Sequence, residues 1–253
     1  MWCLSYAANV LWAQGYPDQS LRRAYEALTL AQALSHPHSL AAALFYVALT
    51  HGYRREEHAT REQADAALAC ASEQGFPLYL VLAMLYRGWA LAIQGQAEEG
   101  IAQLQQVLAA FRATGAKLAL SAMLSLLAEA YAKAGQVEAS LQTLAAALAL
   151  VDQTQERYYE AELYRLQGEL LLARSAEHHA EAATCFRHAL DVARHQQAKS
   201  LELRAATSLS RLWQQQGKRA EAHELLAPIY GWFTEGFDTK DLQEAKALLE
   251  ALQ

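Results

Sequence analysis

Small residues recur along this chain at intervals of about 40 residues, and this rhythm restricts the fold more than any other feature of the sequence. One column consists of Ala8, Ala48, Gly88, Ala128, Gly168 and, after a short insertion, Ser210. A second column follows in the same units and consists of Ser20, Thr60, Gly100, Ser140, Ala182 and Ala222. Small side chains let two helices approach closely, because a large side chain at the crossing would hold their backbones apart. A fixed period of this length indicates stacked structural repeats.

Each unit has the pattern of a helical hairpin. A central turn carries a residue that suits the left-handed backbone ending a helix, as at Gly15, Gly95, Gly135 and Gly217. Ala and Leu dominate while Val, Ile and Phe are few, which favours helices over strands. We therefore predict one all-α domain, a right-handed α-solenoid of six hairpins followed by a capping helix. The predicted hairpins span residues 1–34, 35–74, 75–114, 115–154, 155–196 and 197–236, and the capping helix spans 237–253.

Composition argues against several classes of protein. The formal net charge is -6, and Lys and Arg are scattered, so nothing attracts nucleic acid. Cys3, Cys70 and Cys185 lie far apart and outside any C-x-x-C pattern, as expected for free thiols in a reducing compartment. The longest uncharged run, residues 27–53, is broken by "SHPHS" into apolar pieces shorter than the about 20 residues of a membrane span. We expect a cytoplasmic protein that binds neither membranes nor nucleic acid.

The residues that could carry chemistry do not form a reactive constellation. His178 and His179 are adjacent, so they cannot share a helix face, and they fall in the inserted segment, which we expect to be a solvated loop without a metal. Cys185 lies near His188, but no orienting acid is evident, so we expect a buried thiol and not a nucleophile. No group supplies nucleophile, base and orienting residue together. We expect no cofactor and no enzymatic activity.

Small residues at the eighth and twentieth positions of each unit, Gly at the fifteenth and Ala-Leu at the twenty-seventh and twenty-eighth resemble the tetratricopeptide repeat. The unit is longer than the usual 34 residues of that repeat. Stretches such as "RGWALAIQGQAEEGIAQL" and "YYEAELYRLQGELLLARS" look like the C-terminal repeat tail of bacterial proteins that join a class III nucleotide cyclase to a predicted AAA-type ATPase. In that family the cyclase and ATPase chemistry lies upstream of the tail, and this chain contains no G-x-x-x-x-G-K-[ST] phosphate loop.

The resemblance also implies a binding surface, because the first helix of each unit lines the concave face of a tetratricopeptide superhelix. The matching positions predict an apolar and aromatic end of the groove, formed by Asn9, Trp12, Phe45, Leu49, Tyr53, Leu85 and Trp89. They predict a charged end formed by Glu129, Lys133, Glu162, Arg165, Glu169, Arg204 and Arg211. The alternative is that the Trp and Phe side chains pack against a neighbouring turn or a further repeat.

These expectations describe a non-catalytic interaction and regulatory module that binds a peptide or partner domain in its groove. Cyclase or ATPase domains of the same polypeptide are candidate partners. Two alternatives stay open: a small-molecule sensor, which requires an enclosed pocket, and a structural module that self-associates. Self-association is suggested because residues 1–14 resemble a first repeat helix without a capping residue ahead of it, so that a further repeat or another chain is expected against it.

Overall fold

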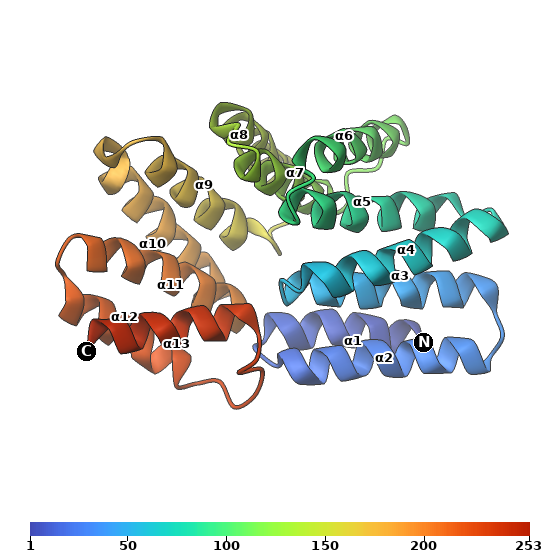
Figure 1. The fold of residues 1–253 in the computed structure, drawn as a ribbon, viewed down its shortest axis with the longest axis horizontal. Helices are drawn as coiled ribbons and strands as arrows, with labels where there is room; N and C mark the ends of the chain where they lie inside the picture. The colour runs from blue at the N-terminus through green and yellow to red at the C-terminus, as the bar shows by residue number, and fades with distance from the viewer.

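A computed structural model describes the backbone of residues 1–253 and all side chains except that of Ala176. The described chain is all-helical, with thirteen α-helices and no strand, which confirms the predicted fold class. The helices are α1 (Trp2–Ala13), α2 (Pro17–Ala33), α3 (Pro37–Tyr53), α4 (Glu57–Gln74), α5 (Pro77–Ile93), α6 (Ala97–Ala113), α7 (Leu120–Lys133), α8 (Val137–Thr154), α9 (Glu160–Arg174), α10 (His179–His195), α11 (Lys199–Gln215), α12 (Arg219–Tyr230) and α13 (Lys240–Leu252). A 3-10 turn, η1 (Ala176–His178), precedes α10. Successive antiparallel pairs stack into a curved array (Figure 1).

The small-residue columns lie where the two helices of a hairpin cross. In the first unit the Ser20 hydroxyl donates a hydrogen bond to the carbonyl oxygen of Ala8, at 2.7 Å. The same bond joins Ser140 to Ala128 in the fourth unit, at 2.6 Å. These serine hydroxyls reach a carbonyl of the facing helix because no larger side chain separates the backbones. The forty-residue period of the sequence therefore reflects the spacing of the helix crossings along the chain.

The fourth and fifth units begin differently from the second and third. Helices α3 and α5 start at Pro37 and Pro77, whose fixed φ suits the first helical position. Lys117 and Arg157 occupy the corresponding places, and there α7 and α9 start three residues later, at Leu120 and Glu160. The unwound segments 117–119 and 157–159 reach the inner face of the array, where they contribute to the site described below.

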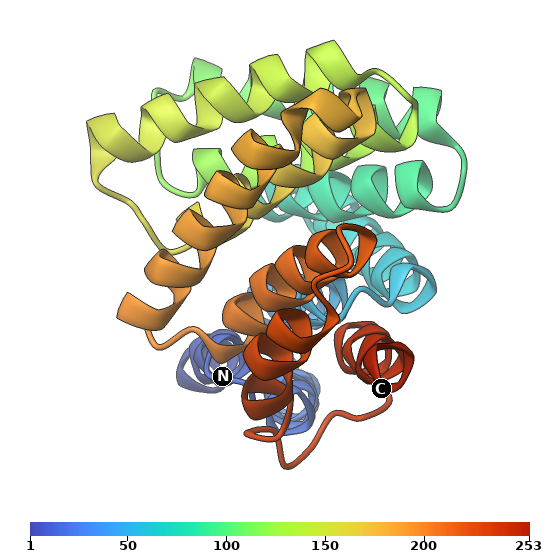
Figure 2. The same ribbon diagram turned by 90° about the vertical axis from the view of Figure 1, so that its left-hand side faces the viewer.

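The two ends of the array meet, which the sequence analysis did not predict. Views from two directions show α1 and α2 beside α11 and the segment between α12 and α13 (Figures 1 and 2). We call these contacts the closure interface; its residues are Trp12, Asp18, Gln19, Tyr53, Arg54 and Arg55 on one side and Ser200, Arg204, Glu235, Gly236, Asp238, Asp241 and Glu244 on the other. The last repeats thus cover the end of the first hairpin near Trp12 and Asp18, whereas the expected contact of residues 1–14 with a further repeat or another chain stays a prediction. Trp2, Tyr6 and Val10 on α1 remain exposed.

Reciprocal capping holds the closure interface together. The carboxylate of Glu235 accepts hydrogen bonds from the backbone N–H groups of Asp18 and Gln19, at 3.0 and 2.9 Å. It thereby caps the first turn of α2, whose own N-cap residue, Tyr16, makes no side-chain capping bond. In return, the N–H of Gly236 donates to the carboxylate of Asp18, at 2.9 Å.

Candidate functional site

The inner face of the array contains an apolar cavity of about 930 Å³. Helices α1, α3, α5 and α7 form most of its wall, and residues of the segment joining α10 to α11 complete it. Its mouth carries exposed apolar side chains, among them Tyr6, Leu78 and Leu118. Because Trp12 and Leu201 both line the cavity, its wall includes the two ends of the array and depends on the closure interface.

A column of three tyrosines and one leucine at the sixth position of the repeat forms one wall of this cavity. It consists of Tyr6, Tyr46, Tyr86 and Leu126, which recur at the forty-residue interval. The sequence analysis missed these residues because the tetratricopeptide pattern does not place that position on the concave face. The signal was present in the sequence, since the alignment that reveals the small columns also brings three tyrosines into register.

The unwound segments before α7 and α9 form the opposite side of the cavity. They contribute Leu118 and Ala119 from one repeat and Tyr158 and Tyr159 from the next. The N–H of Ala119 is capped by both carboxylate oxygens of Glu156, each at 2.9 Å, so a residue of the following repeat fixes the start of α7. The late starts of α7 and α9 thus shape the cavity, and the repeat pattern of the sequence did not indicate them.

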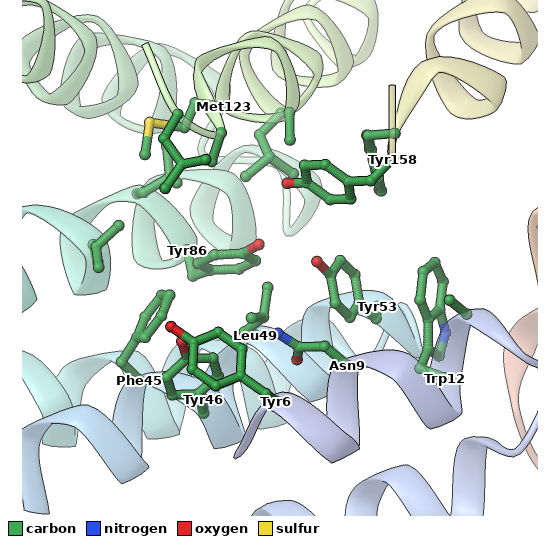
Figure 3. Close-up of a pocket in the computed structure, with 18 of the residues that line it drawn as sticks. Tyr6, Asn9, Trp12, Phe45, Tyr46, Leu49, Tyr53, Tyr86, Met123 and Tyr158 are labelled. Atoms are coloured by element: carbon green, nitrogen blue, oxygen red, sulfur yellow. The ribbon is translucent and has the colours of Figure 1, made fainter. Parts of the chain in front are cut away.

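Several polar groups lie inside the apolar wall. The hydroxyls of Tyr53, Tyr86 and Tyr158 point into the same space, and the amide of Asn9 lies beside them (Figure 3). The ring of Tyr53 stacks on Trp12, with centroids 4.2 Å apart and planes 13° from parallel. Burial raises the pKa of Tyr53 and of Tyr86, so both remain protonated at neutral pH.

Six of the seven residues predicted for the apolar end line this cavity: Asn9, Trp12, Phe45, Leu49, Tyr53 and Leu85. The seventh, Trp89, lines a smaller, more polar pocket that adjoins the cavity. Its indole N–H donates to a carboxylate oxygen of Glu129, at 3.0 Å. Phe45 and Trp89 are only 7% and 4% exposed, so their side chains also pack within the core of the array.

Four of the seven residues predicted for the charged end, Glu162, Arg165, Glu169 and Arg204, form ion pairs with one another. Glu162, 2% exposed, binds Arg165 at 2.7 Å and Arg204 at 3.4 Å. Arg204 extends the network to Asp241 at 2.7 Å and donates to the carbonyl oxygen of Tyr53 at 2.6 Å. Arg204 thereby joins the charged end of the groove to the closure interface, and the charges of Glu162, Arg165, Arg204 and Asp241 are neutralised within the chain.

Opposing effects set the protonation of the two buried acids. Burial alone would raise the pKa of Glu162, but the charges of Arg165 and Arg204 outweigh it and lower that pKa to about 2. Burial, reinforced by the charge of Glu162, instead raises the pKa of Glu129. The two glutamates are both buried, but their pKa values shift in opposite directions because only Glu162 contacts arginine side chains directly.

The remaining predicted residues are peripheral. Glu169 and Arg211 line a polar pocket of about 300 Å³ beside the network, where Arg211 lies 3.5 Å from Glu244. Lys133 is exposed at the end of α7 and lines neither the apolar cavity nor the polar pocket beside the network. Asp241 and Glu244, which the sequence analysis assigned only to the capping helix, are additional members of the charged end.

The residues considered for chemistry lie apart from this site. His178 ends η1 and His179 begins α10, which corrects the expectation of an irregular loop. His178 lies 3.3 Å from the carboxylate of Glu181, and among the described residues no three His, Cys, Asp or Glu side chains are grouped as a metal site would require. The three cysteines are free thiols. None of the helices in the described chain is long and apolar enough to span a bilayer.

Curved stacking of helical hairpins around a concave cavity defines the chain as an α-solenoid of the tetratricopeptide repeat class. Comparison with solved structures supports this fold: apo RapI superposes with a TM-score of 0.66 at 14% identity, covering 98% of this chain and 83% of that one. A Rap protein in complex with competence and sporulation factor gives 0.68 at 12% identity, covering 98% and 73%. The signal transduction ATPase with a tetratricopeptide repeat sensor from Pyrococcus horikoshii gives 0.53 at 15%, covering 98% and 37%.

Sequence comparison adds one relative. An uncharacterized protein of Rhizobium meliloti (strain 1021) is 27% identical over 209 residues, which is 83% of this chain. The match covers 20% of that protein, so the chain spans about one fifth of its relative's length. No protein-family model matches the chain.

Proposed function

We propose that the chain is a non-catalytic binding module that takes up an apolar segment of a peptide or protein partner in the cavity of its inner face. The observation that carries this proposal is the cavity itself, with its aromatic wall drawn from several repeats and its exposed apolar mouth. Its volume lies within the range of about 300–1,000 Å³ that is usual for ligand sites. Aromatic side chains in such a wall supply large contact areas at little entropic cost.

The setting of the module is part of the same proposal. We infer a cytoplasmic regulatory tail of a larger signalling protein, with ATPase or cyclase domains of the same polypeptide among its partners. The fold shared with the repeat sensor of a signal transduction ATPase supports this inference, as does a relative about five times longer than the matched segment. The free thiols agree with a reducing compartment.

Charges placed at the cavity mouth should abolish binding without disturbing the fold. Leu78 and Leu118 are 55% and 75% exposed, so aspartate at both positions adds charge at little packing cost. Leu34, 60% exposed and outside the cavity, provides a matched control as Leu34→Asp. Random peptides displayed on phage and selected on the wild-type chain should be rich in aromatic and aliphatic residues. Binding of the selected peptides, measured by fluorescence anisotropy, should weaken about tenfold or more in the double variant only.

A different result would reject the proposal. Selected peptides that bind the double variant and Leu34→Asp as tightly as the wild type would locate binding outside the cavity. Circular dichroism spectra of all three chains, with equal helical signals, ensure that a loss of binding is not a loss of structure.

A second candidate function is the sensing of a small molecule. It is favoured by the way in which the closure interface brings both ends of the array into the cavity wall, since an open groove would not surround a small ligand. Both functions use the same cavity, and the chemistry at its centre is common to both.

A further inference from the structure

The cavity wall is uncharged. Among the residues that the structure describes, none of those that line the cavity is Asp, Glu, Lys, Arg or His. Arg204 lies behind Trp12, with its guanidinium carbon 5.1 Å from the centre of that ring, and is already paired with Glu162 and Asp241. An ionised ligand group would lose its hydration on entry and find no opposite charge in return.

The wall nevertheless carries hydrogen-bonding groups, and three of them lie close together. The hydroxyls of Tyr53, Tyr86 and Tyr158 come from α3, from α5 and from the segment before α9, and they converge on the space shown in Figure 3. Within the described structure, none of the three hydroxyls has a hydrogen-bond partner from the protein. They are therefore free to bind a ligand atom, and three separate repeats position them.

The tyrosine cluster acts mainly as a donor set. A phenol is protonated at neutral pH, and burial raises the pKa of Tyr53 and Tyr86 further, so each retains an O–H to donate. A carbonyl oxygen has two lone pairs and can accept from two such donors at once. A hydrocarbon at the same place would remove water from the hydroxyls without replacing its hydrogen bonds.

From this arrangement we infer that the cavity selects an apolar ligand carrying an uncharged oxygen acceptor, a carbonyl or hydroxyl held between Tyr53, Tyr86 and Tyr158. Carboxylates and ammonium groups are rejected. The inference rests on the proposed function, because it requires the cavity to be a binding site, and it adds the chemical class of the occupant. A peptide with blocked ends and a neutral small molecule both present this chemistry.

Matched probes of nearly equal size distinguish binding of a neutral oxygen acceptor from binding of a hydrocarbon or of a charged group. Benzylacetone carries a ketone, butylbenzene replaces it with hydrocarbon, and hydrocinnamate replaces it with a carboxylate. Titrations followed by ligand-detected NMR should show benzylacetone binding about tenfold more tightly than either of the others. A second arm compares an N-acetylated, C-amidated Leu-Phe dipeptide with the same dipeptide bearing free termini, and so distinguishes a peptide source from a small molecule.

Removing the three tyrosine hydroxyls should abolish the preference for the ketone over the hydrocarbon, while the hydrocarbon should still bind. In the triple variant Tyr53→Phe, Tyr86→Phe and Tyr158→Phe, affinity for benzylacetone should fall to that for butylbenzene, which itself should change little. Tyr158→Phe alone, at an exposed position, guards against a folding defect and should give part of the loss. Tyr230→Phe lies outside the cavity and should have no effect.

The outcomes distinguish a failure of the inference about ligand chemistry from a failure of the proposed function. If hydrocinnamate binds as tightly as benzylacetone, or if the ketone preference persists in the triple variant, the inference is wrong while the cavity remains a binding site. If none of the five probes binds, the proposed function fails and the inference with it.

Discussion

At the scale of single residues, the columns of small residues allow the two helices of a hairpin to cross closely. Gly88 and Gly100 face each other in the third unit, where other units place a serine hydroxyl against a carbonyl. A β-carbon at Gly100 would lie 2.7 Å from the backbone nitrogen of Ala92 and would also clash with the carbonyl oxygen of Gly88. Backbone atoms cannot rotate away as a side chain can, so this crossing requires glycine.

Gly100→Ala should therefore destabilise the chain although alanine is the better helix former. The gain in helix propensity is about 1 kcal/mol, and overpacking of a tight contact typically costs about 1–3 kcal/mol. Here the clash with two backbone groups should dominate, giving a net loss that thermal or urea unfolding can measure. Gly88→Ala, whose β-carbon would approach its nearest neighbours only to 3.2 Å, should lose less. A Gly100→Ala chain as stable as the wild type would contradict the crossing geometry.

At the scale of elements, α9 and α11 are joined by a buried charge network rather than by apolar side chains alone. Glu162 on α9 binds Arg165 on the same helix and Arg204 on α11. Removing one partner of such a network leaves an uncompensated buried charge, which is more costly than the pair is stabilising. The network thus fixes how the two helices face each other.

Acid should weaken this contact in a defined pH window. The pKa of Glu162 is about 2 in the folded chain and near 4.5 when unperturbed, so its contribution is complete above pH 4.5 and is lost as pH falls toward 2. The shift corresponds to about 3 kcal/mol. Unfolding free energies measured by urea titration between pH 5 and pH 2 should fall less steeply in Glu162→Gln than in the wild type. Equal slopes would show that Glu162 titrates normally in the folded chain.

The helices also show what the sequence could and could not predict. The forty-residue period predicted the all-α fold and the crossings, because both depend on contacts that every repeat shares. It did not predict the late starts of α7 and α9, since these follow from the missing prolines and from Glu156, which reaches back to Ala119. The binding role of the groove residues remains a prediction, although six of them line the cavity.

At the scale of the whole molecule, the decisive feature is the closure interface. Its members, such as Glu235 and Arg54, belong to no repeated column, so no periodic signal marks them. Arg54, 3% exposed, pairs with Asp18 at 3.0 Å and with Asp238 at 3.4 Å. Arg55 adopts a left-handed backbone, with φ of 60°, and reaches Asp241 at 3.1 Å. The strain of that conformation falls where the two ends meet.

Glu235→Ala should loosen the closure interface specifically. It removes the carboxylate that caps α2, a loss of about 1 kcal/mol for a typical cap. Amide hydrogen exchange should speed up in the first turn of α2 and in the segment after α12, while the third and fourth hairpins stay protected. Glu224→Ala, on α12 outside the closure interface, serves as the control. Unchanged exchange in α2 would mean that the contact does not hold the ends together.

Closure also fixes the number of copies that the architecture tolerates. In an open array each hairpin touches only its neighbours, so units can be added or lost with little effect on the rest. Here an extra hairpin inserted between α8 and α9 would carry Ser200 and Glu235 away from Trp12 and Asp18, and one fewer would force them into collision. The number of repeats therefore sets the width of the inner cavity, which cannot change by duplication of a hairpin unless the closure interface breaks.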